Sequence, residues 1–508
     1  MDISIKDACK TCPFRPSLYY NPGMKDFPRL SCGLLAALLL AVVICLPAQA
    51  KDKPVKVYIL SGQSNMVGIG TVNTSGTRWG KEFSNPTLSV YEGAYDPEKD
   101  YDKAKPTKTV ELESFGGVKP TPYPGGGVQI VRGTVTMKET GVYEFRPGYG
   151  SSENCIMVVN GTEAHRKENG DKNAKRTSIK MEGGKAYDFK ITYLNNGANG
   201  LGWYARNDFP GTLNTVIKQQ GKYPELLDDT GNWAVRDDVW YKGVVTATAN
   251  QWLSVNCGAG SGKVGPELGF GWALGDYHDE PVLILKASQG NRSLAWDFLP
   301  PGSERFEAEV QTREGEMKTH FIAGYKDRHA MWEKGTNPED PKHTWYAGKQ
   351  YDDCFNAAKD VLANFDANFP MWKGRGYEIA GFVWWQGHKD SGHPVHRTNY
   401  QKNLSQLIKT LRSEFKAPNA PFIVGTVGFG GFDGMSDNFK EIAEAQLAVD
   451  SSRNPFEKNV KTLETRGFWK SAEESPRNQD FHYHQNGEVY LNVGQAFGKG
   501  MIELLEGK

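Results

Sequence analysis

Four short, almost entirely apolar segments constrain the fold more than any other feature of this sequence. Each has the length of one strand and runs into small or polar residues at its end. A short segment that is apolar throughout predicts a strand covered on both faces, which is typical of a parallel sheet. The segments are residues 57–60 (VYIL), 281–287 (PVLILKA), 379–385 (IAGFVWW) and 421–427 (PFIVGTV).

Amphipathic helices are predicted between and after these strands. One apolar stripe begins at Tyr400 and continues at helical spacing to Leu411. Further helices are predicted at residues 441–449 and 490–505. The alternation of strands and helices predicts an α/β fold, with a doubly wound parallel sheet and helices on both of its faces.

A segment of different character interrupts this pattern at residues 84–208. It is rich in Gly, Thr, Tyr and Lys, and turn signals such as Asn160-Gly161 separate its short alternating runs. Several short strands at this spacing predict a β-sandwich. Because the α/β pattern resumes afterwards, we expect the β-sandwich to be inserted into one discontinuous α/β domain, residues 51–83 and 209–508. The predicted strands of the insert are residues 141–145, 155–159, 186–193 and 201–204.

Residues 1–50 are predicted to be a signal peptide with an upstream extension. Residues 33–46 form an uninterrupted apolar run of fourteen, shorter than the roughly 20 residues of a membrane span. Lys25 and Arg29 precede this run, and residues 48–50 (AQA) follow it as a small-x-small cleavage signal. The sequence thus predicts a secreted or periplasmic protein that no membrane holds after cleavage; a retained anchor is the alternative.

The charge and the cysteine content exclude several classes of protein. With 60 basic and 60 acidic side chains the formal net charge is +0, which argues against a nucleic-acid binder. After residue 50 the cysteines are Cys155, Cys257 and Cys354, enough for one disulfide at most, so a hydrophobic core has to stabilise the fold. The CxxC pair at residues 9–12 has no second pair beside it and is a weak metal signal.

Ser64 is a candidate nucleophile because of where it lies. The strand at residues 57–60 runs directly into residues 61–66 (SGQSNM). Ligands of open parallel sheets bind at the carboxyl ends of the strands, and a serine on a Gly-containing strand-to-helix turn lies beside free helix amides. The turn is not the G-x-S-x-G elbow of α/β-hydrolases. A serine that merely caps a helix is the alternative.

Five of the 10 histidines fall in two short segments. His388, His393 and His396 follow the strand at residues 379–385, and His482 and His484 precede the last predicted helix. Zinc is one interpretation, but neither H-E-x-x-H nor paired-Cys spacing occurs, so we expect no metal or other cofactor. We expect His393 and His396 in a solvated loop. An early nucleophile and a late histidine suit a serine hydrolase, because the sheet brings the two ends together.

Several sequence blocks follow one another in a characteristic order. They are residues 62–66 (GQSNM), 264–268 (VGPEL), 286–294 (KASQGNRSL, similar to K-x-x-x-G-G-x-S-L) and 385–390 (WQGHKD, similar to W-x-Q-G-E-x-D), and then His482 followed by Gly494. In this order they resemble the blocks of the sialate O-acetylesterase-like group of SGNH hydrolases, which includes carbohydrate esterase family six and its relatives. The resemblance covers about residues 55–75 and 210–508, nearly all of the predicted α/β domain.

This resemblance implies a fold and a role for each matching residue. The fold would be the SGNH-type, flavodoxin-like doubly wound sheet. Ser64 would be the nucleophile, and its N–H would be the first oxyanion donor. Gly290 and the side-chain amide of Gln386 would supply further donors. His482, a neutral imidazole with a pKa near 6.5, would take the serine proton and return it to the leaving sugar hydroxyl.

Three positions depart from the pattern of the group. Its members usually carry Asp three residues before the histidine, where this chain has Gln479. Asp480 lies two residues before His482, so either the turn shifts to make a Ser–His–Asp triad or the site is a Ser–His dyad. Asn291 occupies the position of the second glycine in the third block, and its amide is a further candidate for a hydrogen-bond donor to the oxyanion. His388 stands for the usual Glu of the fourth block.

The insert resembles the protective-antigen-like β-sandwich of secreted glycan-active proteins. The similarity is carried by residues 141–145 (GVYEF), 159–161 (VNG) and 182–187 (EGGKAY), together with Tyr193 and Trp203. Such a domain would hold glycan through aromatic faces; core packing is the alternative for Tyr143, Tyr193 and Trp203. The adjacent aspartates of the calcium-binding versions have no convincing counterpart.

The sequence therefore predicts a secreted serine esterase that removes acetyl groups from an acetylated carbohydrate through an acyl-enzyme on Ser64. The alternative is a glycan-binding protein with a decayed hydrolase site, in which the β insert carries the function. A lipase lacks support, because the sequence shows no long apolar lid.

Overall fold

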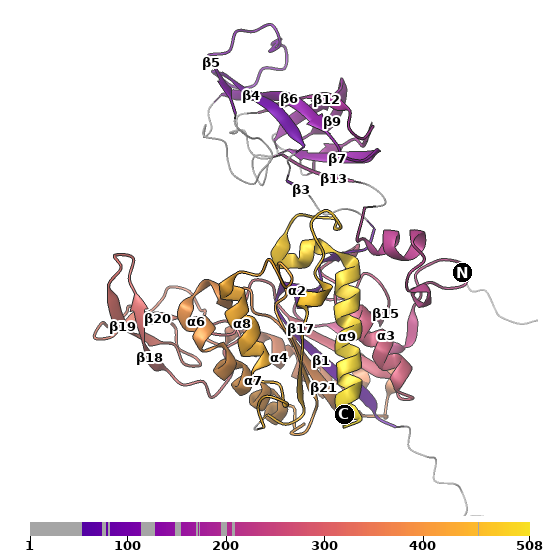
Figure 1. The fold of residues 1–508 in the computed structure, drawn as a ribbon, viewed down its shortest axis with the longest axis vertical. Helices are drawn as coiled ribbons and strands as arrows, with labels where there is room; N and C mark the ends of the chain where they lie inside the picture. Colours follow the sequence, from indigo (N-terminus) through magenta and orange to yellow (C-terminus); the bar gives the residue numbers. More distant parts are fainter. Residues whose placement is uncertain are drawn as a thin grey trace, which may run out of the picture. The chain divides into compact units, whose positions relative to one another are not determined.

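The structure, a computed structural model, describes residues 53–507 apart from 74–77, 80–81, 113–126, 148–153, 169–170, 172, 195–200, 206–208 and 456. The predicted signal peptide lies outside these residues. A seven-stranded sheet lies at the centre of the α/β part (Figure 1). Its order is β15 (Asn250–Leu253), β14 (Arg236–Gly243), β17 (Val282–Ser288), β1 (Val55–Gly62), β21 (Tyr377–Trp385), β22 (Phe422–Gly425) and β23 (Val460–Leu463).

All neighbours in this sheet run parallel except β15, which is antiparallel to β14 at the edge. The four strands predicted from the apolar segments correspond to β1, β17, β21 and β22. Strand β17 lies on one side of β1 and β21 on the other. The chain therefore leaves β1 at a point where the strand order reverses, and such switch points form crevices at the carboxyl edge of parallel sheets.

Helices cover both faces of the sheet, as two consecutive tryptophans show. The Trp384 indole N–H donates to the Tyr400 hydroxyl of α7 at 3.3 Å, whereas the Trp385 ring packs on Phe497 of α9, 5.7 Å between centroids. Successive strand residues point to opposite faces, so α7 and α9 lie on different sides. The longer helices are α3 (Glu267–Tyr277), α4 (Lys349–Ala363), α7 (Tyr400–Glu414), α8 (Asp437–Leu447) and α9 (Gly487–Leu505).

The last helix packs very closely against α3, beside which it lies in Figure 1. A Cβ on Gly494 would stand 2.1 Å from the Pro266 carbonyl oxygen, and one on Gly269 would stand 2.2 Å from the Leu491 carbonyl oxygen. Only glycine fits at such separations. This contact gives a physical reason for the glycine at position 494: it packs against Pro266, which belongs to the block at residues 264–268.

Several smaller elements complete the α/β part. The short helices are α2 (Ser64–Val67), α5 (Phe365–Asn368) and α6 (Pro394–Thr398), with a π-helix at Asn214–Gln219. A three-stranded antiparallel sheet, which the sequence pattern did not predict, contains β18 (Phe306–Gln311), β19 (Met317–Ile322) and β20 (Met331–Glu333). A two-stranded ladder joins β2 (Gly70–Thr71) to β16 (Lys263–Val264). Single 3-10 turns lie at Pro224–Leu226, Pro370–Trp372, Asp390–Gly392, Arg466–Phe468 and Asp480–Gln485.

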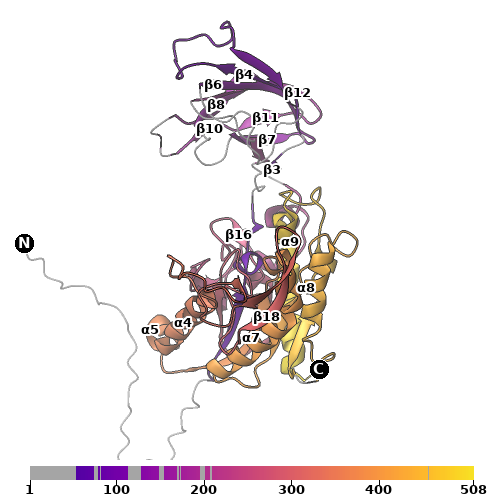
Figure 2. The same cartoon turned by 90° about the vertical axis from the view of Figure 1, so that its left-hand side faces the viewer.

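Two antiparallel sheets form between residues 78 and 205, and Figure 2 shows them as two layers. Many of their buried side chains, Val131 and Phe145 among them, belong to one hydrophobic cluster, whereas Tyr91, Val128 and Ile130 belong to a smaller second one. One sheet has the order β10 (Lys175–Arg176), β9 (Thr162–Arg166), β8 (Cys155–Val159), β12 (Ala186–Tyr193), β6 (Val128–Thr136), β4 (Phe83–Tyr91) and β5 (Lys108–Glu111). The other has β11 (Ile179–Met181), β7 (Gly141–Pro147), β13 (Leu201–Ala205) and β3 (Arg78–Trp79).

These sheets begin upstream of the boundary predicted at residue 84, because β3 pairs with β13. Tyr143 and Tyr193 are buried in the shared cluster, which makes them core residues and not sugar platforms. The side chain of Trp203 lies outside the described part.

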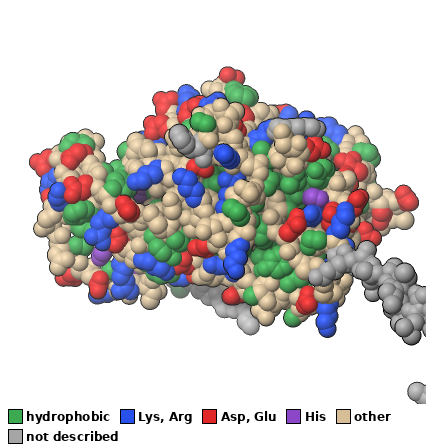
Figure 3. Space-filling model, turned by 90° about the horizontal axis from the view of Figure 1, so that it is seen from below, with side chains coloured by type: hydrophobic (Ala, Val, Ile, Leu, Met, Phe, Trp, Pro, Cys, Tyr) green, Lys and Arg blue, Asp and Glu red, His purple; other side chains and the backbone are tan. Residues whose placement is uncertain are grey.

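Cys155, Cys257 and Cys354 are all buried and unpaired with one another, so the disulfide that the sequence allowed is not formed. Among the described residues, no helix is long and apolar enough to cross a membrane. On the face seen in Figure 3, basic and acidic side chains are interspersed, as expected from the balanced charge of the sequence.

Candidate active site

Ser64 lies where β1 turns sharply into α2. Gly62, the last residue of β1, has a φ of +148°, and a Cβ there would stand 2.1 Å from the Trp385 carbonyl oxygen of β21. A side chain would therefore push the two strands apart at the carboxyl edge of the sheet. The turn leaves Ser64 half-buried as the first residue of α2, where backbone N–H groups have no acceptor within the helix.

His482 contacts Ser64 from a position 418 residues further along the chain. Its Nε2 lies 2.9 Å from the Ser64 Oγ. The three residues after it, Tyr483, His484 and Gln485, have φ values of 47°, 51° and 57°, a left-handed stretch that turns the chain tightly toward α9. The hydrogen bond of 2.8 Å between the Tyr483 hydroxyl and Thr465 helps to hold this turn.

A neutral amide, not a carboxylate, contacts the other nitrogen of the imidazole. The Gln479 Oε1 lies 2.8 Å from the His482 Nδ1. Because an amide oxygen only accepts, this contact places the proton on Nδ1 and leaves the Nε2 lone pair toward Ser64. Gln479 occupies the position three residues before the histidine, where the resemblance led us to expect Asp.

Asp480, the candidate third member of a triad, does not contact His482. Its Oδ1 accepts hydrogen bonds from the Trp469 indole N–H at 2.7 Å and from the Gly430 backbone N–H at 3.1 Å. The turn between residues 479 and 482 presents the side chain three positions before the histidine, so a residue two positions before it points elsewhere. The expectation for Asp480 was therefore wrong.

The surroundings of His482 favour its neutral form. Burial lowers the pKa of the imidazole from 6.5 to about 3, and the nearby His388, Arg477 and Lys263 add to the effect because each is or can become positive. Lys263 is itself largely enclosed: its Nζ lies 3.1 Å from the Thr71 Oγ1 and 3.0 Å from the Gln485 Oε1. The imidazole is therefore a proton acceptor over a wide range of pH.

Two side chains connect the serine turn to the histidine turn. The Asn65 Nδ2 donates to the Phe481 carbonyl at 3.2 Å, and the Tyr490 hydroxyl of α9 lies 2.6 Å from the Asn65 Oδ1. The same hydroxyl lies 3.2 Å from the His482 carbonyl. All three contacts fix the two turns relative to each other. The sequence analysis quoted Asn65 within a block but gave it no role.

Gly290 lies beside Ser64, whereas Asn291 is exposed. A Cβ on Gly290 would stand 3.8 Å from the Ser64 Cβ. Asn291 has a φ of 54°, a left-handed conformation that favours glycine, which is the residue that the resembling block carries there. The loop after β17 thus brings backbone amides to the serine, as an oxyanion site needs.

Gln386 is not available as an oxyanion donor in this structure. Its Nε2 lies 2.9 Å from the Arg292 carbonyl and 2.6 Å from the Asp390 Oδ2, contacts that use both amide hydrogens. The Tyr400 hydroxyl holds the Gln386 Oε1 at 2.8 Å. Gln386 is buried and positions the loop after β17, so the donor role that the resemblance implied for it has to be corrected.

Asp390 supports the same loop and was missed as a site residue. Its buried carboxylate accepts the backbone N–H groups of Leu294 and Ala295, both at 2.8 Å. Burial raises the pKa of Asp390 to about 6, against the opposing effect of these hydrogen bonds and the one from Gln386. Its place in the block at residues 385–390 was the available signal.

A fully buried ion pair lies beneath the serine turn. The Lys286 ammonium of β17 pairs with the Glu267 carboxylate of α3, and both side chains are 0% exposed. The Lys286 Nζ also donates to the Val67 carbonyl at 3.3 Å, and the Glu267 Oε1 accepts the Gly265 N–H at 2.8 Å. The pair therefore joins α2, α3 and β17. A lysine inside an otherwise apolar strand was the sequence signal for it.

The three histidines of the first segment lie among aromatic rings or against each other. The His388 ring stacks on Phe481 at 4.8 Å and on Phe439 at 5.7 Å, and its burial lowers its pKa. The ring centroids of His393 and His396 lie 4.9 Å apart. His396 belongs to α6, and burial lowers its pKa to about 4. The prediction of a solvated loop is therefore wrong for His396. Among the described residues, no group of three His, Cys, Asp or Glu side chains could hold a metal ion.

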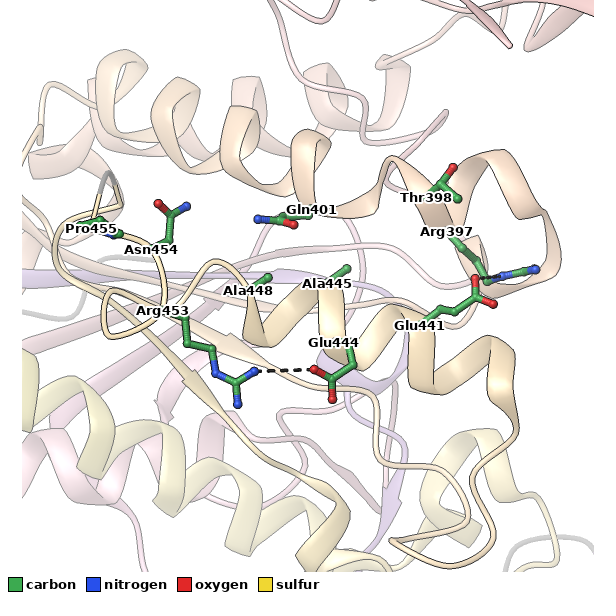
Figure 4. A pocket seen from close by; sticks show the side chains of 10 residues that line it. All are labelled: Arg397, Thr398, Gln401, Glu441, Glu444, Ala445, Ala448, Arg453, Asn454 and Pro455. Carbon is green, nitrogen blue, oxygen red and sulfur yellow. Dashed lines mark hydrogen bonds and ion pairs between the residues drawn. The ribbon is translucent and has the colours of Figure 1, made fainter. Parts of the chain in front are cut away.

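A separate pocket between α6, α7 and α8 does not adjoin the serine (Figure 4). Its charged side chains pair with each other: Arg397 with Glu441 at 2.6 Å and Arg453 with Glu444 at 3.6 Å. Because these charges are neutralised in pairs, the described residues that line the pocket have no unpaired charge that could bind a charged ligand.

Two protein families match parts of the chain. Residues 329–503 match the family described as carbohydrate esterase, sialic acid-specific acetylesterase, and residues 85–220 match the PA14 domain. No curated protein matches the chain at a significant level.

Three solved structures are similar to the chain. A carbohydrate acetylesterase from Xanthomonas citri is 11% identical, with 75% of this chain and 72% of that chain covered and a TM-score of 0.34. A carbohydrate esterase family 2 enzyme with a carbohydrate binding domain, from Corynascus thermopiles, is 12% identical, with 77% and 96% covered and a TM-score of 0.28. A protein from Arabidopsis thaliana is 14% identical, with 54% and 88% covered and a TM-score of 0.31.

Likenesses at these identities and TM-scores do not by themselves assign a fold or an activity. The family matches extend over named residues, and the first of them includes His482, Gln386 and Asp390. Two parts of the chain thus match known families: residues 329–503 match the carbohydrate esterase family described as sialic acid-specific acetylesterase, and residues 85–220 match the PA14 domain.

Proposed function

We propose that this protein is a serine esterase that hydrolyses O-acetyl esters on carbohydrates. The observation that carries the proposal is the contact of 2.9 Å between the Ser64 Oγ and the His482 Nε2, beside the backbone of Gly290. A hydroxyl, a neutral imidazole that accepts its proton and nearby amide donors are what acyl transfer requires. The match to a carbohydrate esterase family supports an acetyl ester on a carbohydrate as the substrate.

The mechanism follows from the hydrogen bonds at the site. Ser64 Oγ attacks the acetyl carbonyl carbon while the His482 Nε2 takes the serine proton. The resulting oxyanion accepts hydrogen bonds from the Ser64 and Gly290 N–H groups, with Asn291 as a further candidate. His482 then returns the proton to the departing sugar oxygen, which leaves acetyl-Ser64. Water attacks this ester, again losing its proton to His482, and acetate and Ser64 are released.

Gln479 replaces the carboxylate of a full triad in this proposal. It keeps the imidazole in the required tautomer through the Nδ1–H but brings no negative charge to the imidazolium. The site is therefore a Ser–His dyad oriented by an amide. The order β17–β1–β21–β22–β23 supports an SGNH-type, flavodoxin-like sheet, in which the switch point beside β1 is the ligand site.

The proposal includes a domain organisation and a location. The catalytic domain is discontinuous: its first segment ends before β3, upstream of the boundary predicted at residue 84, and its second segment is residues 209–508. The intervening part is a protective-antigen-like β-sandwich, supported by its two-layered sheets and its PA14 match. Export is supported by the apolar run at residues 33–46 and the cleavage signal after it. The substrate would then be an extracellular or periplasmic acetylated glycan.

The test is acetate release from a set of acetylated glycans, combined with labelling by a fluorophosphonate, a reagent that reacts with activated serines. We expect acetate release from at least one glycan and a label on the peptide that contains Ser64, located by mass spectrometry. A protein that retains glycan without releasing acetate or taking up label would instead be the glycan-binding protein with a decayed site.

The pH dependence of kcat/KM should show that an amide, Gln479, and not a carboxylate contacts the His482 Nδ1. Because the pKa of His482 is lowered to about 3, the imidazole remains neutral in mild acid, where a histidine of pKa 6.5 would be only about 3% neutral at pH 5. The acid limb of kcat/KM should therefore lie well below pH 6.5. Gln479→Glu places a carboxylate against the Nδ1, raises the pKa of His482 and shifts the acid limb upward by about one pH unit or more.

The measurement is kcat/KM for p-nitrophenyl acetate across the acidic range. Asp480→Asn is the matched control, because that carboxylate contacts Trp469 and Gly430 and not the imidazole. An acid limb that moves as far in Asp480→Asn as in Gln479→Glu would contradict the orientation of His482 by Gln479.

A further inference from the structure

A second pocket is lined in part by Arg292, two residues after Gly290 in the loop that follows β17. Because consecutive Cα atoms are about 3.8 Å apart, the Arg292 Cα lies within about 7.6 Å of the Gly290 Cα. Ser64, Gly290 and His482 do not line this pocket, so the pocket and the serine are separate but share the loop after β17, which carries both Gly290 and Arg292. Its main lining residues are Arg292, Trp296, Arg328, His329, His343 and Trp345.

The side chains that line this pocket include two arginines, two histidines and two tryptophans but no carboxylate. Arg328 is exposed, and no described carboxylate lies within ion-pair distance of it. Its neighbour Asp327 instead forms an ion pair with Arg305, whose Nε and Nη2 donate to the carboxylate at 2.9 and 2.6 Å. In contrast to the pocket of Figure 4, the positive charge here is not neutralised within the pocket.

Arg292 is held in a fixed orientation. Its guanidinium lies over the Trp345 ring, 4.8 Å from the centroid, and its Nε donates to the Gln350 Oε1 at 3.0 Å. Behind it, the buried Asp297 lies 3.9 Å from the Nε and balances part of the charge. Its Nη2 makes no hydrogen bond to any described residue. A guanidinium held in this way is preorganised to bind a carboxylate with little loss of side-chain entropy.

We propose that this pocket binds a carboxylate-bearing sugar of the substrate, with Arg292 and Arg328 as its donors and Trp296 as an apolar wall. The inference rests on the proposed esterase function and extends it. Because Gly290 beside Ser64 and Arg292 in the pocket belong to the same loop, the proposal places the charged sugar next to the sugar that carries the acetyl ester. The substrate is then an acidic oligosaccharide or polysaccharide, and a free acetylated monosaccharide would leave the pocket empty.

The test compares an acetylated acidic oligosaccharide with an acetylated neutral one. The probes are partly acetylated oligogalacturonides, acetylated oligosaccharides that contain a sialic acid beside the acetylated sugar, and acetylated xylo-oligosaccharides. We expect a higher kcat/KM for at least one acidic probe than for the neutral one. Arg328→Gln should lower this ratio by roughly fivefold, mostly through KM, because one charge-assisted contact is lost. High salt should reduce the ratio as well.

Arg313→Gln is the matched control. Arg313 is exposed at the turn between β18 and β19, does not line the pocket, and its loss changes the net charge equally. The two acidic probes distinguish a uronic acid from a sialic acid as the source of the carboxylate. Equal ratios in the unmodified protein, Arg328→Gln and Arg313→Gln would overturn the proposal.

A failure of the esterase proposal is recognisable separately. In that case the unmodified protein turns over neither the glycans nor p-nitrophenyl acetate. The pocket is then tested by direct binding of unacetylated oligogalacturonides and sialyl oligosaccharides, measured by calorimetry. Weaker binding by Arg328→Gln than by Arg313→Gln supports the pocket, and equal binding or none rejects it.

Discussion

Ser64→Ala is expected to lower the turnover of p-nitrophenyl acetate by about 10⁴-fold or more, since losing the nucleophile of a serine hydrolase costs up to about 10⁶-fold in kcat. The reason is that the acyl-enzyme cannot form without the Oγ that His482 deprotonates. The free energy of unfolding should change little, because Ser64 is half-buried and the removed oxygen contacts only the imidazole among the described hydrogen bonds. Activity is measured as release of p-nitrophenol, and stability by urea unfolding.

The control for this prediction is Ser405→Ala. Ser405 is a half-buried serine of α7 and is not part of the site, so its loss should leave turnover unchanged. If Ser64→Ala retains the unmodified rate, the reaction does not pass through this serine and the proposed mechanism is wrong.

Lys286→Met is expected to have the largest effect on stability. It leaves the Glu267 carboxylate fully buried without its cation, which should lower the free energy of unfolding by about 3–5 kcal/mol. The comparison is Lys349→Met, which breaks the Lys349–Asp353 pair of α4. These side chains are 26% and 42% exposed, so the cost should be only about 0.3–0.5 kcal/mol.

The double variant Lys286→Met with Glu267→Leu separates the loss of pairing from the loss of packing. Removing both charges eliminates the unpaired carboxylate, so the double variant should be more stable than Lys286→Met by about 2 kcal/mol. It should stay below the unmodified protein, because the Val67 carbonyl and the Gly265 N–H each lose a partner. Unfolding followed by tryptophan fluorescence provides the values for the unmodified protein, Lys286→Met, Glu267→Leu and the double variant. Additive effects of the two substitutions would show that the charges do not depend on each other.

The central sheet was predictable because its strands carry an unambiguous pattern. Strands β1, β17, β21 and β22 are almost entirely apolar, and their burial on both faces follows from that alone. Strand β14, with the sequence RDDVWYKG, alternates and carries charges, so it resembles a surface strand although it lies inside the sheet. The hairpin of β18 and β19 also alternates, and nothing in its pattern shows where it packs.

The site was predictable to the level of its loops but not of its side-chain contacts. Ser64, His482 and Gly290 meet because strand ends and the last helix bring them together. Asp480 was misplaced because the turn between residues 479 and 482 decides which side chain faces the imidazole. The left-handed turn that follows was not foreseen either, because three consecutive residues with positive φ leave no sequence signature when none is glycine. Gln386 was misassigned because only packing shows that both of its N–H hydrogens are already used.

The distance along the chain between the serine and its imidazole has a consequence for biosynthesis. Ser64 is synthesised 418 residues before His482, and the turn that carries His482 is held by the Tyr490 hydroxyl of α9, 3.2 Å from the His482 carbonyl. Under the proposed mechanism, a polypeptide whose synthesis has not yet reached α9 therefore has the serine without its proton acceptor, and ester hydrolysis becomes possible only after that helix has folded.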